Sequence, residues 1–276
     1  MLLAKPLETP AYLNMLHPHA DGLVASYLFN ERGGKVFDYT RNQNYLSITN
    51  ATWVANGLQF DASGEYASLD NTNQVVNSQS GTITIYFKSL SAFNDNGART
   101  LFGSYSGAVG VGAFVLVKTA ANALMFIMHD GTFHYIRMNS APVKWQTGFY
   151  LTIQWDRQNA IYGGYNMAFN YDGKYITPDT TLNATNWNNY TINTPLGVGN
   201  DITATTNHCN GIISEGNFYN KVLPESTLKS LNDNPYSMYY QPSNVFLNLM
   251  GAYPGAGKKQ DSIYYGANAF PIGRGL

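Results

Sequence analysis

The chain has 276 residues, a net charge of −1 and one cysteine, and its few Lys and Arg residues are scattered along the sequence. No basic stripe is present, which argues against nucleic-acid binding, and a single cysteine excludes an intrachain disulfide. No apolar run reaches the ~20 residues of a transmembrane helix, and the start MLLAKPLETPAYLN lacks the apolar core of a secretory signal. We therefore expect a protein made in a reducing cytoplasm, with no membrane association.

Short runs rich in β-branched and aromatic residues predict strands, and clusters of Gly, Asn and Asp separate them. In chain order the expected strands are 23–30, 57–61, 66–69, 82–89, 99–105, 112–118, 123–129, 133–138, 149–155, 166–171, 194–200 and 211–220. In the run 149–155, Leu151, Ile153 and Trp155 alternate with polar residues, which predicts a strand with one buried face. Strands in this number, with no helices between them, indicate two packed antiparallel sheets.

Two Asp-Gly pairs predict tight hairpins. Asp130-Gly131 and Asp172-Gly173 each separate two apolar runs. A type I′ turn needs φ > 0 at both central residues, and Asp-Gly satisfies that requirement.

The segment LPESTLKSLNDNP, residues 223–235, predicts a short helix. Leu223, Leu228 and Leu231 form one apolar stripe, Pro224 suits the first turn and Pro235 ends the helix.

Both ends of the chain differ from the middle. Residues 1–20 contain three Pro and two His, and residues 237–276 are rich in Pro, Gly and Tyr and show no clear strand pattern. We interpret them as an N-terminal and a C-terminal arm that flank a domain over residues 21–236. The tail is too aromatic for a solvated linker, so we expect the arms to lie on a surface.

Four stretches in order resemble the concanavalin A-like, laminin-G-type jelly roll. They are HPHADGLVASYLFN at 17–30, ATWVANGLQFDASGEYASL at 51–69, KWQTGFYLTIQW at 144–155 and GIISEGNFYNKVL at 211–223. The resemblance covers roughly residues 20–236 and implies an all-β, two-sheet antiparallel jelly-roll sandwich. This chain departs from the family at Ser214, where Asp is usual, and at Gly216, where Val is usual. The segment DYTRNQNY also lacks the family's Gly-Asn turn.

The flanks carry a narrower likeness. The HP-x-A-x-GLV opening and the NPY with its aromatic tail are similar to laminin-G-type proteins of tailed bacteriophages. That resemblance implies a non-enzymatic virion structural protein, a capsid decoration or a tail surface component that adheres to carbohydrate. Its partners would be neighbouring virion subunits, or further copies of the chain, contacted through the arms.

Glu215 is the candidate acid for a glycosidase. Related jelly-roll glucanases carry two or three carboxylates at alternate positions of one strand, where they face one cleft. The alternate neighbours of Glu215 are Ile213 and Asn217, so it has no carboxylate partner on its own strand. We therefore expect no catalytic residues and no enzyme activity, and polysaccharide cleavage is the least favoured alternative.

Calcium binding is a second interpretation of Glu215. In folds of this type the residues that match Asp38 and Glu215 lie near each other, and Asn42 is a further oxygen donor. Because Ser214 replaces a carboxylate and the Gly-Asn turn is missing, we expect no metal ligands and no cofactor, with calcium as the alternative. We favour a structural role, in which Glu215 accepts hydrogen bonds from backbone groups near the opening strands.

Two aromatic segments are candidates for glycan binding, because lectin-like sites combine aromatic rings with amide and hydroxyl groups. Trp187, Asn189 and Tyr190 lie in the Asn-rich segment 183–191, and Tyr162 and Tyr165 lie in IYGGYN. The alternative is that Trp187 folds down as a loop anchor while the Asn residues cap turns. If these residues do bind sugar, a free glycan-binding module becomes the main alternative to the virion protein.

Overall fold

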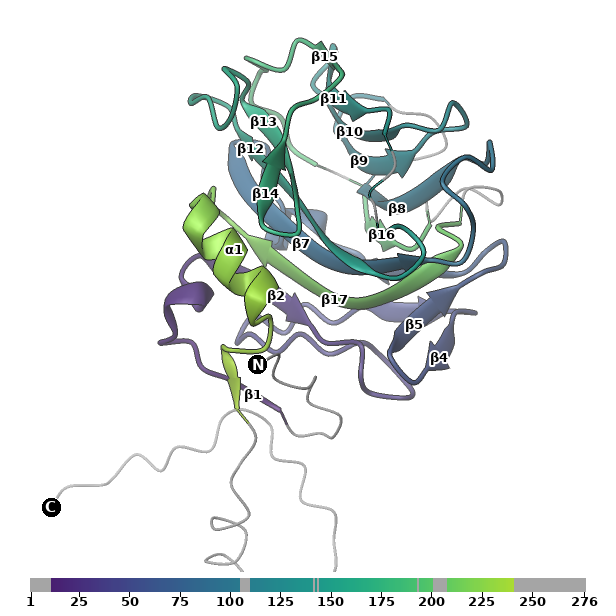
Figure 1. The fold of residues 1–276 in the computed structure, drawn as a ribbon. Helices are drawn as coiled ribbons and strands as arrows, with labels where there is room; N and C mark the ends of the chain where they lie inside the picture. The colour runs from purple at the N-terminus through teal and green to yellow at the C-terminus, as the bar shows by residue number, and fades with distance from the viewer. Residues whose placement is uncertain are drawn as a thin grey trace, which may run out of the picture.

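Two eight-stranded antiparallel sheets face each other and form a β-sandwich (Figure 1). The first sheet has the strand order β15-β11-β10-β9-β8-β16-β6-β3, and the second has β14-β13-β12-β7-β17-β5-β4 with β2 also paired to β17. This arrangement confirms the sandwich predicted from the sequence. The computed structural model describes residues 11–104, 110–140, 142, 144–192, 194–200 and 208–240.

The strands of the first sheet are β3 (Ser47–Thr49), β6 (Tyr66–Leu69), β8 (Arg99–Ser104), β9 (Ala113–Lys118), β10 (Leu124–His129), β11 (Phe133–Met138), β15 (Thr180–Leu182) and β16 (Leu196–Val198). Those of the second sheet are β2 (Leu23–Tyr27), β4 (Thr52–Val54), β5 (Gly57–Phe60), β7 (Ser80–Ser89), β12 (Phe149–Asp156), β13 (Met167–Tyr171), β14 (Lys174–Ile176) and β17 (Gly211–Tyr219). A separate two-stranded pair joins β1 (Tyr12–Leu13) to β18 (Tyr239–Tyr240). The helical elements are the 3₁₀ turns η1 (Pro18–Ala20) and η2 (Thr72–Gln74) and the helix α1 (Glu225–Asp233).

The main core lies between the two sheets, where alternate residues of each strand point inward. On β7 these residues are Ile83, Ile85 and Phe87, each at most 3% exposed. On β12 they are Leu151, Ile153 and Trp155, as the alternation predicts. Burial of such side chains stabilises a fold by about 1.5–3 kcal/mol each, so the contact between the sheets is the main source of stability.

The outer face of the second sheet is covered as well. Leu228 and Leu231 of α1 pack there with Met238 and Tyr239, and all four are buried. The predicted helix over 223–235 is thus confirmed, and its apolar stripe is the face that packs against the sheet.

This cover overturns one expectation for β12. Gln154 lies on the face of β12 opposite the main core and is 0% exposed. Its amide nitrogen donates to the Leu223 carbonyl at 2.8 Å, and its amide oxygen accepts from the Tyr175 hydroxyl at 2.8 Å. The expectation of one buried face is therefore wrong, because α1 and the segment before it cover the polar face and satisfy its hydrogen bonds.

The two Asp-Gly hairpins differ from each other. Asp172 and Gly173 have φ values of 47° and 83°, and Tyr171 pairs with Lys174, so this turn has the predicted two-residue form. In the other hairpin His129 pairs with Phe133, and Gly131 at 114° is the residue with positive φ. That hairpin therefore has a three-residue loop, and the type I′ expectation fails there.

The described chain begins and ends side by side. Tyr12 pairs with Tyr240, and Leu13 pairs with Tyr239. Figure 1 shows this pair at the lower end of the molecule, whereas β11 and β15 lie at the upper end. Residues 1–10 and 241–276 of the expected arms lie outside the described residues. None of the helices that the structure describes is both long and apolar enough to cross a membrane.

Candidate functional site

A pocket of about 740 Å³ opens where three connecting segments meet. The β10–β11 turn contributes Asp130 and Thr132, β11 contributes His134, and the chain after β12 contributes Arg157 and Gln158. Residues 183 and 185 to 188, which follow β15, complete the lining. The pocket therefore includes the Asn-rich segment that the sequence singled out, together with residues from two other segments.

Asp130 ties the β10–β11 turn to the loop after β15. Its side chain is 2% exposed and accepts from the Nε2 atom of His134 at 2.9 Å. It also accepts from the backbone N–H groups of Thr132 at 2.9 Å and Asn188 at 2.5 Å. Burial alone would raise the pKa of Asp130, but hydrogen bonds from Asn188, His134 and Thr132 outweigh it and lower the pKa to about 2. The carboxylate is ionised and its oxygens are engaged within the protein.

His134 also connects the β10–β11 turn to the loop after β15. Its Nδ1 atom lies 2.8 Å from the Asn183 carbonyl oxygen, while Nε2 contacts Asp130. Both ring nitrogens therefore face protein acceptors, and the ring offers no free nitrogen to a metal or a substrate.

Arg157 forms the cationic wall of the pocket. Its Nε atom donates to the Trp187 carbonyl at 2.7 Å, and Nη1 donates to the Gln79 side-chain oxygen at 3.3 Å. No ion pair joins Arg157 to any carboxylate in the part of the chain that the structure describes.

Trp187 anchors the loop from below. The side chain is 5% exposed, and its indole N–H donates to the Ser78 carbonyl at 2.7 Å. The ring belongs to the main core, because an apolar ring packs there while its N–H still finds an acceptor. The expectation of an exposed Trp187 platform is therefore wrong, and the alternative of a buried loop anchor describes this residue.

Asn189 and Tyr190 also fasten the loop. The side-chain oxygen of Asn189 accepts from the Ser78 hydroxyl at 3.0 Å. The Tyr190 hydroxyl donates to the Ala113 carbonyl at 3.1 Å, and burial raises the pKa of Tyr190 above its ordinary value. Neither residue lines the pocket.

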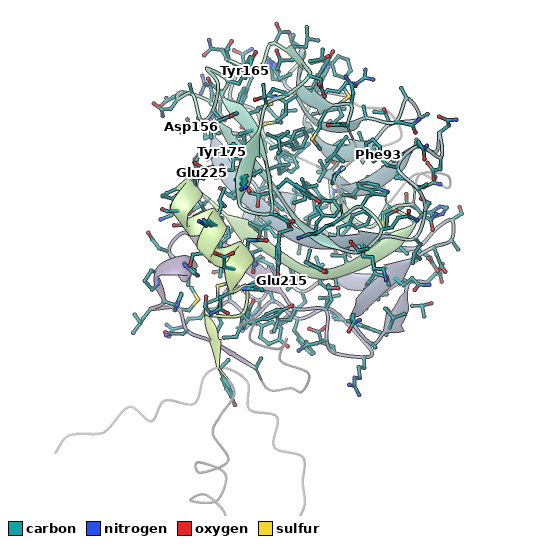
Figure 2. All side chains as sticks on the ribbon, viewed as in Figure 1. Phe93, Asp156, Tyr165, Tyr175, Glu215 and Glu225 are labelled. Atoms are coloured by element: carbon teal, nitrogen blue, oxygen red, sulfur yellow. The ribbon has the colours of Figure 1, made fainter. Side chains whose placement is uncertain are left out.

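Tyr162 and Tyr165 close a tight turn beside the pocket. Tyr165 N–H donates to the Tyr162 carbonyl at 3.0 Å, and Tyr162 stacks on Tyr175 with ring centroids 4.9 Å apart. Asn166, next in the chain, donates through its side chain to the Arg157 carbonyl at 3.0 Å. Figure 2 shows Tyr165 near the top of the molecule and Asp156, the residue before Arg157, on its upper left side. The turn borders the pocket, but the two tyrosines do not line it.

Sequence reasoning missed Asp130, His134, Arg157 and Gln158 as pocket residues. The sequence pattern predicts Asp130 only as a turn residue and assigns no role to His134. The motif HDGTFH carried a usable signal, since an aspartate four residues before a histidine across a hairpin brings the two side chains together. Nothing local marks Arg157, which reaches the pocket through the pairing of β12 and β13.

Glu215 lies away from the pocket, in a buried polar network. It is 1% exposed and accepts from the Tyr150 hydroxyl at 2.5 Å and from the Asn217 side-chain amide at 2.8 Å. Burial, with Glu215 close by, raises the pKa of Tyr150 well above its ordinary value, and Tyr150 also bonds to Tyr236. Figure 2 places Glu215 deep within the molecule.

The same network extends to the end of the described chain. The Asn217 side-chain oxygen accepts from the Ser26 hydroxyl, which in turn contacts the Tyr239 hydroxyl. Glu215 therefore links β17 and β12 to the segment after α1. Two side chains, those of Tyr150 and Asn217, donate hydrogen bonds to Glu215.

Asp38 is the carboxylate that accepts hydrogen bonds from backbone N–H groups. It accepts from the N–H groups of Ser26 at 3.0 Å, Thr40 at 2.9 Å and Asn44 at 2.9 Å. The side-chain amide nitrogen of Asn42 donates to the Val24 carbonyl at 2.8 Å. Among the described residues, no group of three or more His, Cys, Asp or Glu side chains is placed to hold a metal ion.

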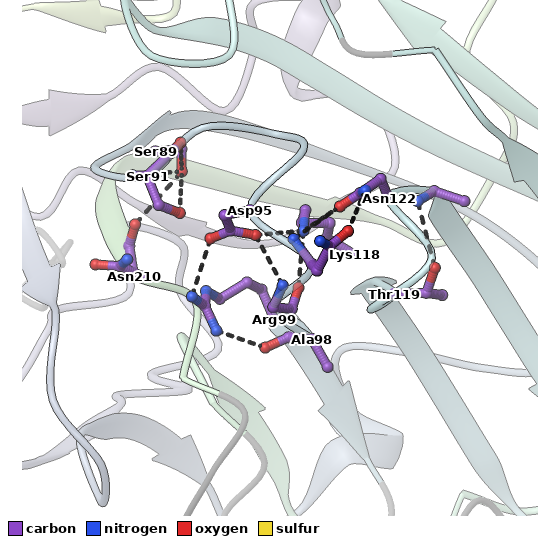
Figure 3. Close-up of polar contacts among 12 residues, drawn as sticks. Ser89, Ser91, Asp95, Ala98, Arg99, Lys118, Thr119, Asn122 and Asn210 are labelled. Atoms are coloured by element: carbon purple, nitrogen blue, oxygen red, sulfur yellow. Dashed lines mark hydrogen bonds and ion pairs between the residues drawn. The ribbon is translucent and has the colours of Figure 1, made fainter.

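A second charged cluster, drawn in Figure 3, fastens the loop between β7 and β8. The fully buried Lys118 ammonium contacts Asp95 at 2.6 Å, the Gly97 carbonyl at 2.8 Å and the Asn122 side-chain oxygen at 3.2 Å. Arg99 pairs with the other oxygen of Asp95 at 3.0 Å. Each of these charges is paired within the protein, so we assign the cluster a structural role.

No protein family and no curated protein matches the sequence. Solved structures of similar fold include Trypanosoma rangeli sialidase in complex with sialic acid, at TM-score 0.58 and 15% identity, over 79% of this chain and 34% of that chain. Another is the ligand binding domain of botulinum neurotoxin serotype D in complex with N-acetylneuraminic acid, at TM-score 0.56 and 13% identity, over 77% of this chain and 50% of that chain. This chain thus spans between a third and half of those chains, and at these identities the likeness shows the β-sandwich fold alone.

Proposed function

We propose that this chain is a non-enzymatic carbohydrate-binding β-sandwich whose ligand occupies the pocket between the β10–β11 turn and the loop after β15. One observation carries the proposal. Five exposed lining side chains make no hydrogen bond within the described residues, and they are those of Thr132, Gln158, Thr185, Asn186 and Asn188. A sugar needs such an array of amide and hydroxyl groups, and about 740 Å³ lies within the usual range for small-molecule sites. Sialic acid complexes of structurally similar proteins support the same ligand class.

Binding without cleavage follows from the carboxylates. Asp130 is the sole carboxylate among the residues that line the pocket, and its oxygens are engaged by the protein. Most glycosidases need two carboxyl groups that flank the scissile bond. Glu215 is buried in its own network and does not reach the pocket lining.

Titration of glycans into the full-length chain tests the binding site. Replacing both Thr185 and Asn186 by Ala removes two exposed side chains that make no hydrogen bond within the described residues, so we expect folding to be preserved. We expect affinity to fall about 10- to 100-fold, since each lost hydrogen bond is worth about 0.5–1.5 kcal/mol. Asn71→Ala, another exposed Asn that lies outside the lining, is the matched control. Unchanged affinity in the double variant, or no glycan bound by the wild type, would overturn the proposal.

Product analysis tests the absence of catalysis. We expect the bound glycan to be recovered intact, by mass spectrometry, after long incubation with the wild type. New reducing ends that disappear in the Glu215→Gln variant would instead establish a glycosidase.

We propose as a second function that the chain is a virion structural protein, with a jelly roll of the laminin-G type. The supporting observation is the β1–β18 pair, which brings both ends of the described chain to the end of the sandwich away from β11 and β15 (Figure 1). Because the two ends of the described part lie at one pole, that pole suits attachment to a virion subunit, while the pocket stays open at the other. Light scattering of the full chain against residues 11–240 tests it. We expect assembly of the full chain alone, and two well-behaved monomers would contradict the proposal.

A further inference from the structure

We infer that the pocket selects acidic glycans and that the guanidinium of Arg157 pairs with a carboxylate on the sugar. This inference rests on the proposed carbohydrate-binding function. It adds the charge of the ligand and the residue that recognises that charge.

The guanidinium of Arg157 is held in place and yet has donors to spare. The bond from Nε to the Trp187 carbonyl at 2.7 Å and the bond from Nη1 to Gln79 at 3.3 Å orient its plane. A guanidinium carries more N–H groups than these two bonds use, and Nη2 has no hydrogen-bond partner within the described chain. Because Arg157 also lines the pocket, an oriented donor edge is available to a ligand.

The charge of Arg157 lacks a counter-ion within the described residues. Some other cations do have one: Lys118 and Arg99 pair with Asp95, and Lys144 pairs with Asp172. Asp156 is adjacent in sequence, but its carboxylate accepts from the backbone N–H groups of Gln158 at 2.9 Å and Asn159 at 3.1 Å.

The one carboxylate among the residues that line the pocket is buried and hydrogen-bonded within the protein. Asp130 contacts His134 at 2.9 Å and is 2% exposed, so a ligand meets little of its negative charge. An anionic ligand therefore encounters a net attractive field from Arg157.

The chemistry of the site favours a carboxylate among anionic groups. An arginine presents two parallel N–H groups that match the two oxygens of a carboxylate. The neutral amides and hydroxyls of residues 185, 186 and 188 suit the sugar hydroxyls beside it. Two sugar classes carry such a group, the uronic acids and the sialic acids, and the structure fits their shared carboxylate.

Ligand modification tests the inference with no change to the protein. Calorimetry with the full-length chain would compare sialyllactose with its methyl ester and with lactose, and digalacturonic acid with its methyl ester. We expect at least one free acid to bind about 10- to 100-fold more tightly than its ester, with affinity falling as salt rises. The pair of ligands in which the free acid binds more tightly than its ester identifies the sugar class.

Variants locate the effect. Arg157→Gln should abolish the preference for acid over ester, whereas Arg41→Gln, at an exposed arginine outside the pocket, should keep it. Arg157→Lys keeps the charge without the paired donors and should retain only part of the preference. Thermal unfolding of each variant separates a lost charge from a displaced loop, since Arg157 also holds the Trp187 carbonyl.

Different results would overturn the proposed carbohydrate binding and the proposed preference for acidic sugars. Equal affinity for acid and ester, reduced by the Thr185 and Asn186 substitutions, would leave carbohydrate binding standing and overturn the acidic preference. Binding only of sulfated glycans would also overturn the carboxylate assignment. No binding of any sugar would remove both proposals.

Discussion

Single side chains beneath the pocket fix its shape. Trp187, Asn189 and Tyr190 each send a polar atom to a partner outside their own loop, on Ser78 or Ala113. The loop after β15 is thereby fastened from below, and its remaining polar side chains are left at the surface.

Replacing Trp187 tests this anchoring. Trp187→Ala empties a core site and removes the bond to Ser78, so we expect a loss of about 3–5 kcal/mol in the free energy of unfolding. Trp187→Phe retains most of the ring volume and should lose about 1–3 kcal/mol. Urea denaturation measures both. A Trp187→Ala variant that keeps full stability but loses glycan binding would show that the ring works at the surface.

Glu215 makes a second prediction at this scale. A glutamine supplies one acceptor and one donor group, where the Tyr150 hydroxyl and the Asn217 amide both require acceptors. Glu215→Gln should therefore cost about 1–3 kcal/mol in urea denaturation, because one buried donor loses its partner. Glu225→Gln, at the exposed start of α1, is the control and should change stability by less than about 1 kcal/mol. Equal effects of the two substitutions would contradict a buried anchoring role for Glu215.

At the scale of elements, sequence patterns predict which segments form strands and helices, but they do not predict which other segments cover them. Alternation in β12 and the Leu stripe of α1 predict both elements, because each pattern is set by local geometry. Burial of Gln154 could not be predicted, since its cover comes from Leu223 and Tyr175, far along the chain. The same holds for Asp130-Gly131, where the aspartate is engaged by Asn188 and the turn departs from the two-residue form.

The last residues of the described chain, which help to cover the outer face of the second sheet, give a prediction at the scale of elements. Met238 is 0% exposed and Tyr239 is 7% exposed, and β18 is the partner of β1. A chain of residues 11–240 should fold, whereas residues 11–236 should be less stable by about 3–6 kcal/mol, since two buried side chains are removed. Urea denaturation of the two chains compares them. Equal stability would show that β18 contributes nothing to the packed structure.

At the scale of the whole molecule, the order of four weak motifs was enough to predict the sandwich, because a fold constrains many positions at once. The pocket was only half predictable. Its Asn-rich loop and the HDGTFH motif are visible in the sequence. No local pattern predicts that Arg157, from a third segment, lies at the same place.

Buried tyrosines make the whole molecule sensitive to alkali. Burial raises the pKa of Tyr27, Tyr150, Tyr219, Tyr236 and Tyr239 above the ordinary value of 10.0. In the unfolded chain these hydroxyls lose their protons near pH 10, whereas in the folded protein they keep them. The folded state therefore binds more protons above that pH, and the stability they contribute is complete below pH 10 and is lost as the pH rises.

We expect the free energy of unfolding to fall above pH 10 by about 1.4 kcal/mol per pH unit for each such tyrosine. Phenolate absorbance should rise in two stages, the second coinciding with loss of the circular dichroism of the strands. Tyr236→Phe removes one raised group and should make the decline shallower. Full ionisation in a single reversible stage, with the strand signal intact, would show that these hydroxyls are open to solvent. The polar network around Glu215 would then have to be looser than the structure shows, because Tyr150 and Tyr236 belong to it.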